Sequence, residues 1–100
     1  MTISPPVKIL LVDNDPDNLE LLQAYLAAPG VDFVLAADGQ QALAQVSALD
    51  FAVIVLDLHM PGMSGFEVAQ RVRANAPGNF TPIIFVTGAD ARAFPIEQAY

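Results

Sequence analysis

The sequence has no cysteine and few cations: only four of its 100 residues are Lys or Arg, against eleven Asp or Glu. Without cysteine the chain cannot form a disulfide or a thiolate metal site, which fits a cytoplasmic protein. The formal net charge of −7 is unfavourable for contact with the phosphates of nucleic acids. We therefore expect that this domain binds no nucleic acid.

Long apolar runs are also absent. No run reaches the roughly 18 residues needed to span a membrane, although 54% of the residues are hydrophobic and the mean hydropathy is +0.46. Residues 1–6 lack the basic and apolar segments of a secretion signal. The chain is long enough for one domain with a modest core. We therefore expect one cytoplasmic domain over residues 1–100 that does not contact a membrane.

The sequence does contain a regular alternation of short apolar runs with helical patterns. The runs have the length of strands that are buried on both faces, and they span residues 7–12, 31–36, 51–56 and 82–86. Parallel strands of this kind are joined by right-handed helical crossovers, so helices cover both faces of the sheet. We predict an α/β fold with a doubly wound parallel sheet, in which the first and third strands are neighbours.

Capping residues mark a helix start after each of the first three runs. These residues are Asp15, Asp38 and Ser64, whose side-chain oxygens can accept hydrogen bonds from the first turn of a helix. Pro16 suits the first helical position, where its missing N–H is not needed. A fourth helix is expected to begin at residue 90 or 94 and to run to residue 100.

Side chains suited to phosphoryl chemistry follow three of the predicted strands. Asp13 comes directly after the first strand, Asp57 after the third and Thr87 after the fourth. The carboxyl ends of parallel strands lie at one edge of the sheet, where open α/β folds bind ligands. Carboxylate oxygens favour Mg²⁺ or another hard cation, and an aspartate can accept a phosphoryl group. The sequence therefore predicts a site at this edge.

Three motifs, in this order, resemble the receiver domains of two-component response regulators over nearly the whole chain. The motifs are Lys8–Asp13, Asp57–Pro61 with Gly65, and Pro82–Thr87. The resemblance implies a flavodoxin-like strand order of 2-1-3-4. It also implies a phosphorelay switch rather than a turnover enzyme. The implied partners are a sensor histidine kinase or phosphotransfer protein and an output domain outside this chain.

The resemblance also assigns roles to individual residues. It implies that Asp57 is the phosphoacceptor and that Thr87 is the switch hydroxyl, which moves toward the phosphate. It implies a Mg²⁺ site formed by Asp13, Asn14, Asp57 and the backbone carbonyl of His59. Asn14 departs from the family, which usually has a second acid there. Because an amide brings no charge, we expect a lower affinity for Mg²⁺.

The end of the chain is the second departure from the family. The family has a fifth strand, a lysine that pairs with the phosphate, and a fifth helix, and no cation of this chain stands at a matching position. We expect a receiver domain that is C-terminally truncated and lacks strand 5 and helix 5. It is either a piece of a longer chain or a shortened receiver. The apolar edge of the run 82–86 would then be uncovered, which predicts self-association.

Three other functions fit parts of the pattern. A receiver with Asn14 and without the lysine could be a docking module that does not switch. An aspartyl phosphohydrolase would use Asp13 and Asp15, but that class needs a larger chain and a catalytic lysine. An EF-hand loop that begins at Asp13 would have Asn18 in place of Gly at its sixth position and Ala24 in place of Glu at its twelfth.

Overall fold

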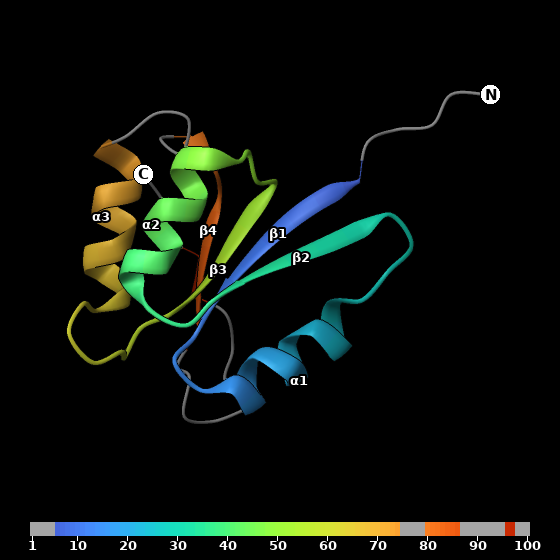
Figure 1. Ribbon diagram of the computed structural model, residues 1–100, viewed down its shortest axis with the longest axis horizontal. Helices are drawn as coiled ribbons and strands as arrows, with labels where there is room; N and C mark the ends of the chain where they lie inside the picture. Colours follow the sequence, from blue (N-terminus) through green and yellow to red (C-terminus); the bar gives the residue numbers. More distant parts are fainter. Residues whose placement is uncertain (1–5, 75–79, 87–95, 98–100) are drawn as a thin grey trace.

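The computed structural model describes residues 6–74, 80–86 and 96–97, which form an open sheet with helices packed against it (Figure 1). The strand order is β2-β1-β3-β4-β5, and the pairs among the first four strands are parallel. The predicted doubly wound sheet with the order 2-1-3-4 is therefore confirmed. In chain order the elements are β1 (Val7–Val12), α1 (Pro16–Leu26), β2 (Val31–Ala36), α2 (Gly39–Ala48), β3 (Val53–Asp57), α3 (Gly65–Ala74), β4 (Ile83–Val86) and β5 (Ile96–Glu97).

The three expected helix caps are present. In each case a side-chain oxygen accepts a hydrogen bond from a backbone N–H in the first turn of the helix, which satisfies a donor that has no partner within the helix. Pro16 is the first residue of α1, as predicted. The three bonds run from the N–H of Asp17 to Asp15 Oδ1 at 2.9 Å, from the N–H of Gln41 to Asp38 Oδ1 at 2.8 Å, and from the N–H of Glu67 to Ser64 Oγ at 3.2 Å.

Strand β3 differs from the sequence-based expectation at both ends. We expected residues 51–56, and the strand spans Val53–Asp57. Phe51 is buried in the core although it precedes the strand. Phe51 is therefore apolar because it packs in the core, and not because it belongs to the strand. At the other end the ladder continues through Asp57, which pairs with Val86 of β4.

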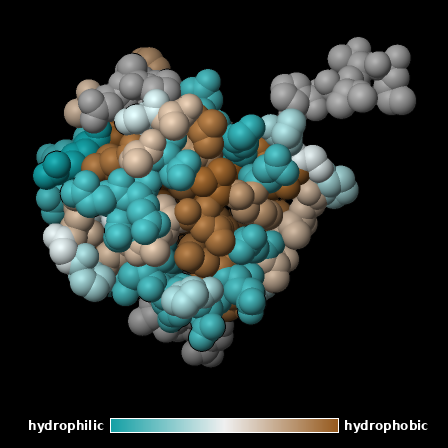
Figure 2. Space-filling model, viewed as in Figure 1, coloured by the Kyte–Doolittle hydropathy of each residue, from teal (hydrophilic) through white to brown (hydrophobic). Residues whose placement is uncertain are grey.

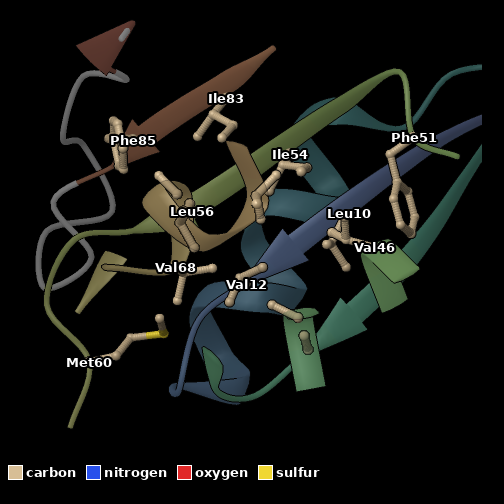
Figure 3. Packing of buried hydrophobic residues seen from close by; sticks show 14 of the residues in the cluster. Leu10, Val12, Val46, Phe51, Ile54, Leu56, Met60, Val68, Ile83 and Phe85 are labelled. Atoms are coloured by element: carbon tan, nitrogen blue, oxygen red, sulfur yellow. The ribbon is translucent and has the colours of Figure 1, made fainter. Parts of the chain in front are cut away.

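Alternating side chains of the strands supply two separate clusters of buried apolar residues. The larger cluster joins the sheet to α2 and α3, and Figure 3 shows Met60 at its end, beyond Val68 and Val12. The smaller cluster joins the opposite face to α1 through Leu19. Strand residues of the larger cluster are Leu10, Val12, Ala36, Ile54, Leu56, Ile83 and Phe85, and those of the smaller cluster are Leu11, Val55 and Val86.

The C-terminal part of the chain corrects two expectations. Ile96 and Glu97 form a short antiparallel strand beside Phe85 and Ile84, so the predicted helix is wrong at these residues, and a fifth strand is present where none was expected. An extended segment can satisfy the backbone groups that an edge strand leaves unpaired. The rest of the predicted helix lies outside the described residues.

β5 covers part of the β4 edge through which we expected chains to associate. The edge of β4 is not bare, because the chain itself pairs with two of its residues. Association of chains through the remainder of this edge stays a prediction. On the face seen in Figure 2, apolar surface gathers in a band over the strands beside α2. No helix in the described parts of the chain is long and apolar enough to cross a membrane.

Candidate functional site

The register of the central strands places the two predicted carboxylates side by side. Val12 of β1 pairs with Leu56 of β3 in parallel, so the next residue of each strand stands at the same level. These next residues are Asp13 and Asp57, and their exposed fractions are 1% and 2%. Two acidic side chains are thus buried at the carboxyl edge of the sheet, as predicted.

Asp13 is held by two hydrogen bonds from the start of α1. Its Oδ1 accepts the backbone N–H of Asp15 at 2.9 Å, and its Oδ2 accepts Nδ2 of Asn18 at 3.3 Å. Burial raises the pKa of Asp13 above the ordinary value of 3.8, and the negative charges of Asp57 and Asp15 raise it further, while the two hydrogen bonds oppose this shift. The folded protein therefore penalises the charged form of Asp13.

Asn18 is a site residue that the sequence analysis missed as such. We considered it only as a position in an EF-hand loop. In the structure it belongs to α1, which runs from Pro16 to Leu26, so the segment after Asp13 is helical and the EF-hand interpretation is wrong. The available signal was the spacing of five residues from Asp13, which places Asn18 in the first turn of the helix that begins at the site.

Asp57 lies where β3 ends and its loop begins. Its Oδ1 accepts the backbone N–H of His59 at 3.2 Å, so the loop turns back over the carboxylate. Leu58 extends the contact with β4 through its N–H, which donates to the carbonyl of Val86 at 3.0 Å. The carboxylate is thereby fixed by the sheet on one side and by the loop on the other.

The loop after Asp57 closes on its own starting point. The N–H of Gly65 donates to the carbonyl of Leu58 at 3.0 Å. A Cβ at position 65 would lie 2.2 Å from the carbonyl oxygen of Asp57 and 2.9 Å from its carbonyl carbon. Real Cβ atoms do not approach backbone this closely, so only glycine allows α3 to begin against Asp57.

The other predicted site residues differ in how the structure describes them. Asn14 and His59 are exposed and adjoin Asp13 and Asp57 along the chain. Asp15 caps α1, so its Oδ1 is already engaged. Thr87, the predicted switch hydroxyl, lies outside the described residues.

The donor set fits a hard cation. The described residues contain no group of three or more His, Cys, Asp or Glu that could hold a metal ion. Mg²⁺ needs no such group, because it usually takes one or two carboxylates, keeps several waters and completes its shell with phosphate. Asp13 and Asp57 supply two carboxylates whose mutual repulsion a cation would relieve.

Comparison with known proteins places this geometry in context. The sequence matches the family model of the response regulator receiver domain over residues 9–99. It is 36% identical over 86 residues to the transcriptional regulatory protein TrcR of Mycobacterium tuberculosis, which covers 86% of this chain and 33% of TrcR. The chain thus spans about a third of the length of that relative.

Two solved structures have the same fold. The chemotaxis protein CheY4 of Vibrio cholerae matches with a TM-score of 0.74 and 36% identity, over 80% of this chain and 67% of CheY4. The receiver domain of a sensor histidine kinase from Pseudomonas aeruginosa matches with a TM-score of 0.76 and 32% identity, over 82% of this chain and 67% of that domain. The latter structure has a magnesium ion coordinated in its active-site cleft.

The close approach of Gly65 to Asp57 predicts the effect of adding one methyl group. We expect Gly65→Ala to lower the free energy of unfolding by about 2–3 kcal/mol, because the new Cβ meets backbone atoms on a central strand. Gly30→Ala is the matched control, since its φ is +80° and its Cβ would meet nothing within 4 Å. Its cost should be only about 1 kcal/mol. Denaturant unfolding measures both, and equal losses would contradict the close contact.

The raised pKa of Asp13 predicts a pH dependence of stability. The folded state binds the Asp13 proton more tightly than the unfolded chain does, so the free energy of unfolding falls as the pH rises from about 3.8 through the raised value. Asp13→Asn removes this loss, because the amide carries no charge. In metal-free buffer the variant should be more stable than wild type at pH 7, and the gain should disappear below pH 3.8. A variant that is less stable at neutral pH would show that the hydrogen bonds of Asp13 outweigh its burial cost.

Proposed function

This chain belongs to the response regulator receiver family, and we propose that its function is to accept a phosphoryl group on Asp57. The observation that carries this proposal is the placement of Asp57, which is buried beside Asp13 at the carboxyl edge of the sheet. A phosphorylation assay on the isolated chain tests the proposal.

The proposed reaction is a transfer between donor and carboxylate. An oxygen of Asp57 attacks the phosphorus atom and forms an acyl phosphate, and the bond from phosphorus to the donor breaks. The donor atom keeps the electron pair of that bond, so a phosphohistidine nitrogen would leave as neutral imidazole after taking up a proton. The chain takes one phosphoryl group and does not turn over a substrate as an enzyme does.

The proposal includes a Mg²⁺ site around the two carboxylates. Asp13, Asp57, Asn14 and the backbone carbonyl of His59 would hold the ion. Mg²⁺ supplies the positive charge that screens Asp57 from the incoming phosphate. Support comes from the all-oxygen donor set and from the repulsion between the buried carboxylates. Asn14 contributes no charge, so we propose a weaker site than one with a second acid at that position.

The proposed partners follow from the transfer itself. A sensor histidine kinase or a phosphotransfer protein would supply the phosphoryl group, in the cytoplasm. Thr87, which follows β4 in the sequence, would respond to the phosphate as a switch hydroxyl. The response would alter contacts with a partner or with an output domain outside this chain.

A docking module that does not switch is the second candidate function. Asn14 favours it, because an uncharged residue follows Asp13 at the position where a second acid would strengthen Mg²⁺ binding. In that case the surfaces of the domain would bind partners whether or not Asp57 is modified. The two functions differ in whether Asp57 takes up phosphate.

We expect one phosphoryl adduct per chain after treatment with acetyl phosphate and Mg²⁺. Intact-mass analysis should show this adduct in wild type and not in Asp57→Asn. Asp50→Asn is the matched control, because Asp50 is an exposed carboxylate that precedes β3, whereas Asp57 is at its carboxyl end, and it should keep the adduct. An adduct that persists in Asp57→Asn would overturn the assignment of the residue, and no adduct in wild type would favour the docking module.

We expect Asn14→Asp to raise the affinity for Mg²⁺ by roughly tenfold. One added charge near a divalent cation in a partly solvated site contributes at least about 1 kcal/mol. Isothermal titration calorimetry on both proteins measures the difference. Asn14→Ala is the control, and it should bind Mg²⁺ no more tightly than wild type. Equal or weaker affinity in Asn14→Asp would mean that position 14 does not face the ion.

A further inference from the structure

The N-terminus of α2 touches the loop that follows Asp57. A Cβ at Gly39, the first residue of α2, would lie 2.7 Å from Sδ of Met63 and 3.1 Å from its Cβ. It would also lie 2.9 Å from Cγ2 of Val68 in α3. The space beside Gly39 is therefore filled by a residue of the loop and by a residue of the helix that the loop leads into.

Packing, not backbone conformation, explains glycine at position 39. Gly30 and Gly62 are the only described glycines with a positive φ, so Gly39 has a backbone that alanine could adopt. Gly39 is the first residue of α2, and alanine is a better helix former than glycine. An alanine at position 39 would therefore be acceptable to the helix and is opposed only by Met63 and Val68.

The contact cannot be relieved by the flexible end of Met63 alone. Methionine adapts its shape easily, so its sulfur could move away from a new methyl group. Its Cβ cannot move without the backbone of the loop, and Val68 is branched at Cβ and stiff. Adding a methyl group at position 39 would thus displace the loop or α3.

Two methionines fix this loop from outside: the buried Met60 belongs to the larger apolar cluster, and Met63 packs against that cluster later in the loop. The ends of the loop are tied together at Leu58 and Gly65. Between them Gly62 turns with a φ of +85°, and the N–H of Met63 donates to the carbonyl of Pro61 at 3.0 Å. Met63 is partly buried against the larger apolar cluster. The path of the second half of the loop therefore depends on where Met63 packs.

We propose that Met63, seated against Gly39, is a positioning residue for phosphoryl transfer to Asp57. The same loop carries His59, whose N–H is bonded to Oδ1 of Asp57. A shift of the loop would move that N–H and the approach to the carboxylate, while the sheet that holds Asp57 stays in place. This inference rests on the proposed function of Asp57 and adds the residues that set the geometry of its loop.

The test uses the full chain and four variants. Met63→Ala removes the anchor, and Gly39→Ala displaces it. Met63→Leu keeps the volume and serves as the conservative variant. Gln40→Ala is the matched control for position 39, because Gln40 is the next residue of α2 and is exposed. Amide NMR spectra report the loop, initial rates with saturating acetyl phosphate and Mg²⁺ report the transfer, and thermal melts report stability.

We expect Met63→Ala and Gly39→Ala to slow the transfer by about tenfold to a hundredfold, the loss typical of a misplaced reacting group. In the same two variants the amide signals of His59 and Gly62 should shift, also without Mg²⁺ or phosphate. Met63→Leu and Gln40→Ala should match wild type in both measurements. A loss of stability alone would not reduce the rate while the protein remains folded.

The outcomes separate this inference from the proposed function. Unchanged loop signals in Met63→Ala, or a wild-type rate despite shifted signals, would overturn the positioning role and leave the phosphoacceptor in place. Equal slowing in Gln40→Ala would also overturn it. A wild-type chain that takes no phosphoryl group would overturn the proposed function, and the positioning role with it.

Discussion

The parallel pairing of β1 with β3 is the interaction on which the rest of the site depends. It sets Val12 opposite Leu56, so Asp13 and Asp57, which follow these two residues, come to the same level of the sheet. Side chains alternate along a strand, and a slip by one residue would direct every side chain of that strand to the other face. The buried residues Leu10, Ile54 and Leu56 oppose such a slip, because they fill the cluster under α2 and α3.

The burial of two like charges at this edge costs stability. The raised pKa of Asp13 reflects burial first and the charge of Asp57 second. Core packing on both faces of the sheet offsets this cost, and so do the hydrogen bonds from Asp15 and Asn18. A positive ligand bound beside the two carboxylates would lower this cost. Such a conflict between local stability and chemistry is common at functional sites.

Features set by neighbouring residues or by the order of the strands could be predicted from the sequence, and features set by other distant contacts could not. The caps at Asp15, Asp38 and Ser64 were predictable, because each bond joins residues two or three positions apart. The start of β3 was not predictable, because Phe51 is apolar like the strand residues that follow it, although it is buried outside the strand. The strand at 96–97 and the space beside Gly39 depend on partners far along the chain. The site pair was predicted because topology fixes where parallel strands end, whereas Thr87 stays a prediction.

The central position of β3 in the sheet holds the strand before Asp57 in place, whereas the loop after Asp57 is outside the sheet. Ile54, Val55 and Leu56 are each paired with β1 on one side and with β4 on the other. A local fluctuation that frees β3 would have to break two ladders at once, so this strand should open only when most of the domain unfolds. A charge added at its end therefore finds a rigid support on one side and a short loop on the other. Because the sheet is rigid there, the loop after Asp57 would be the part that moves in response to such a charge.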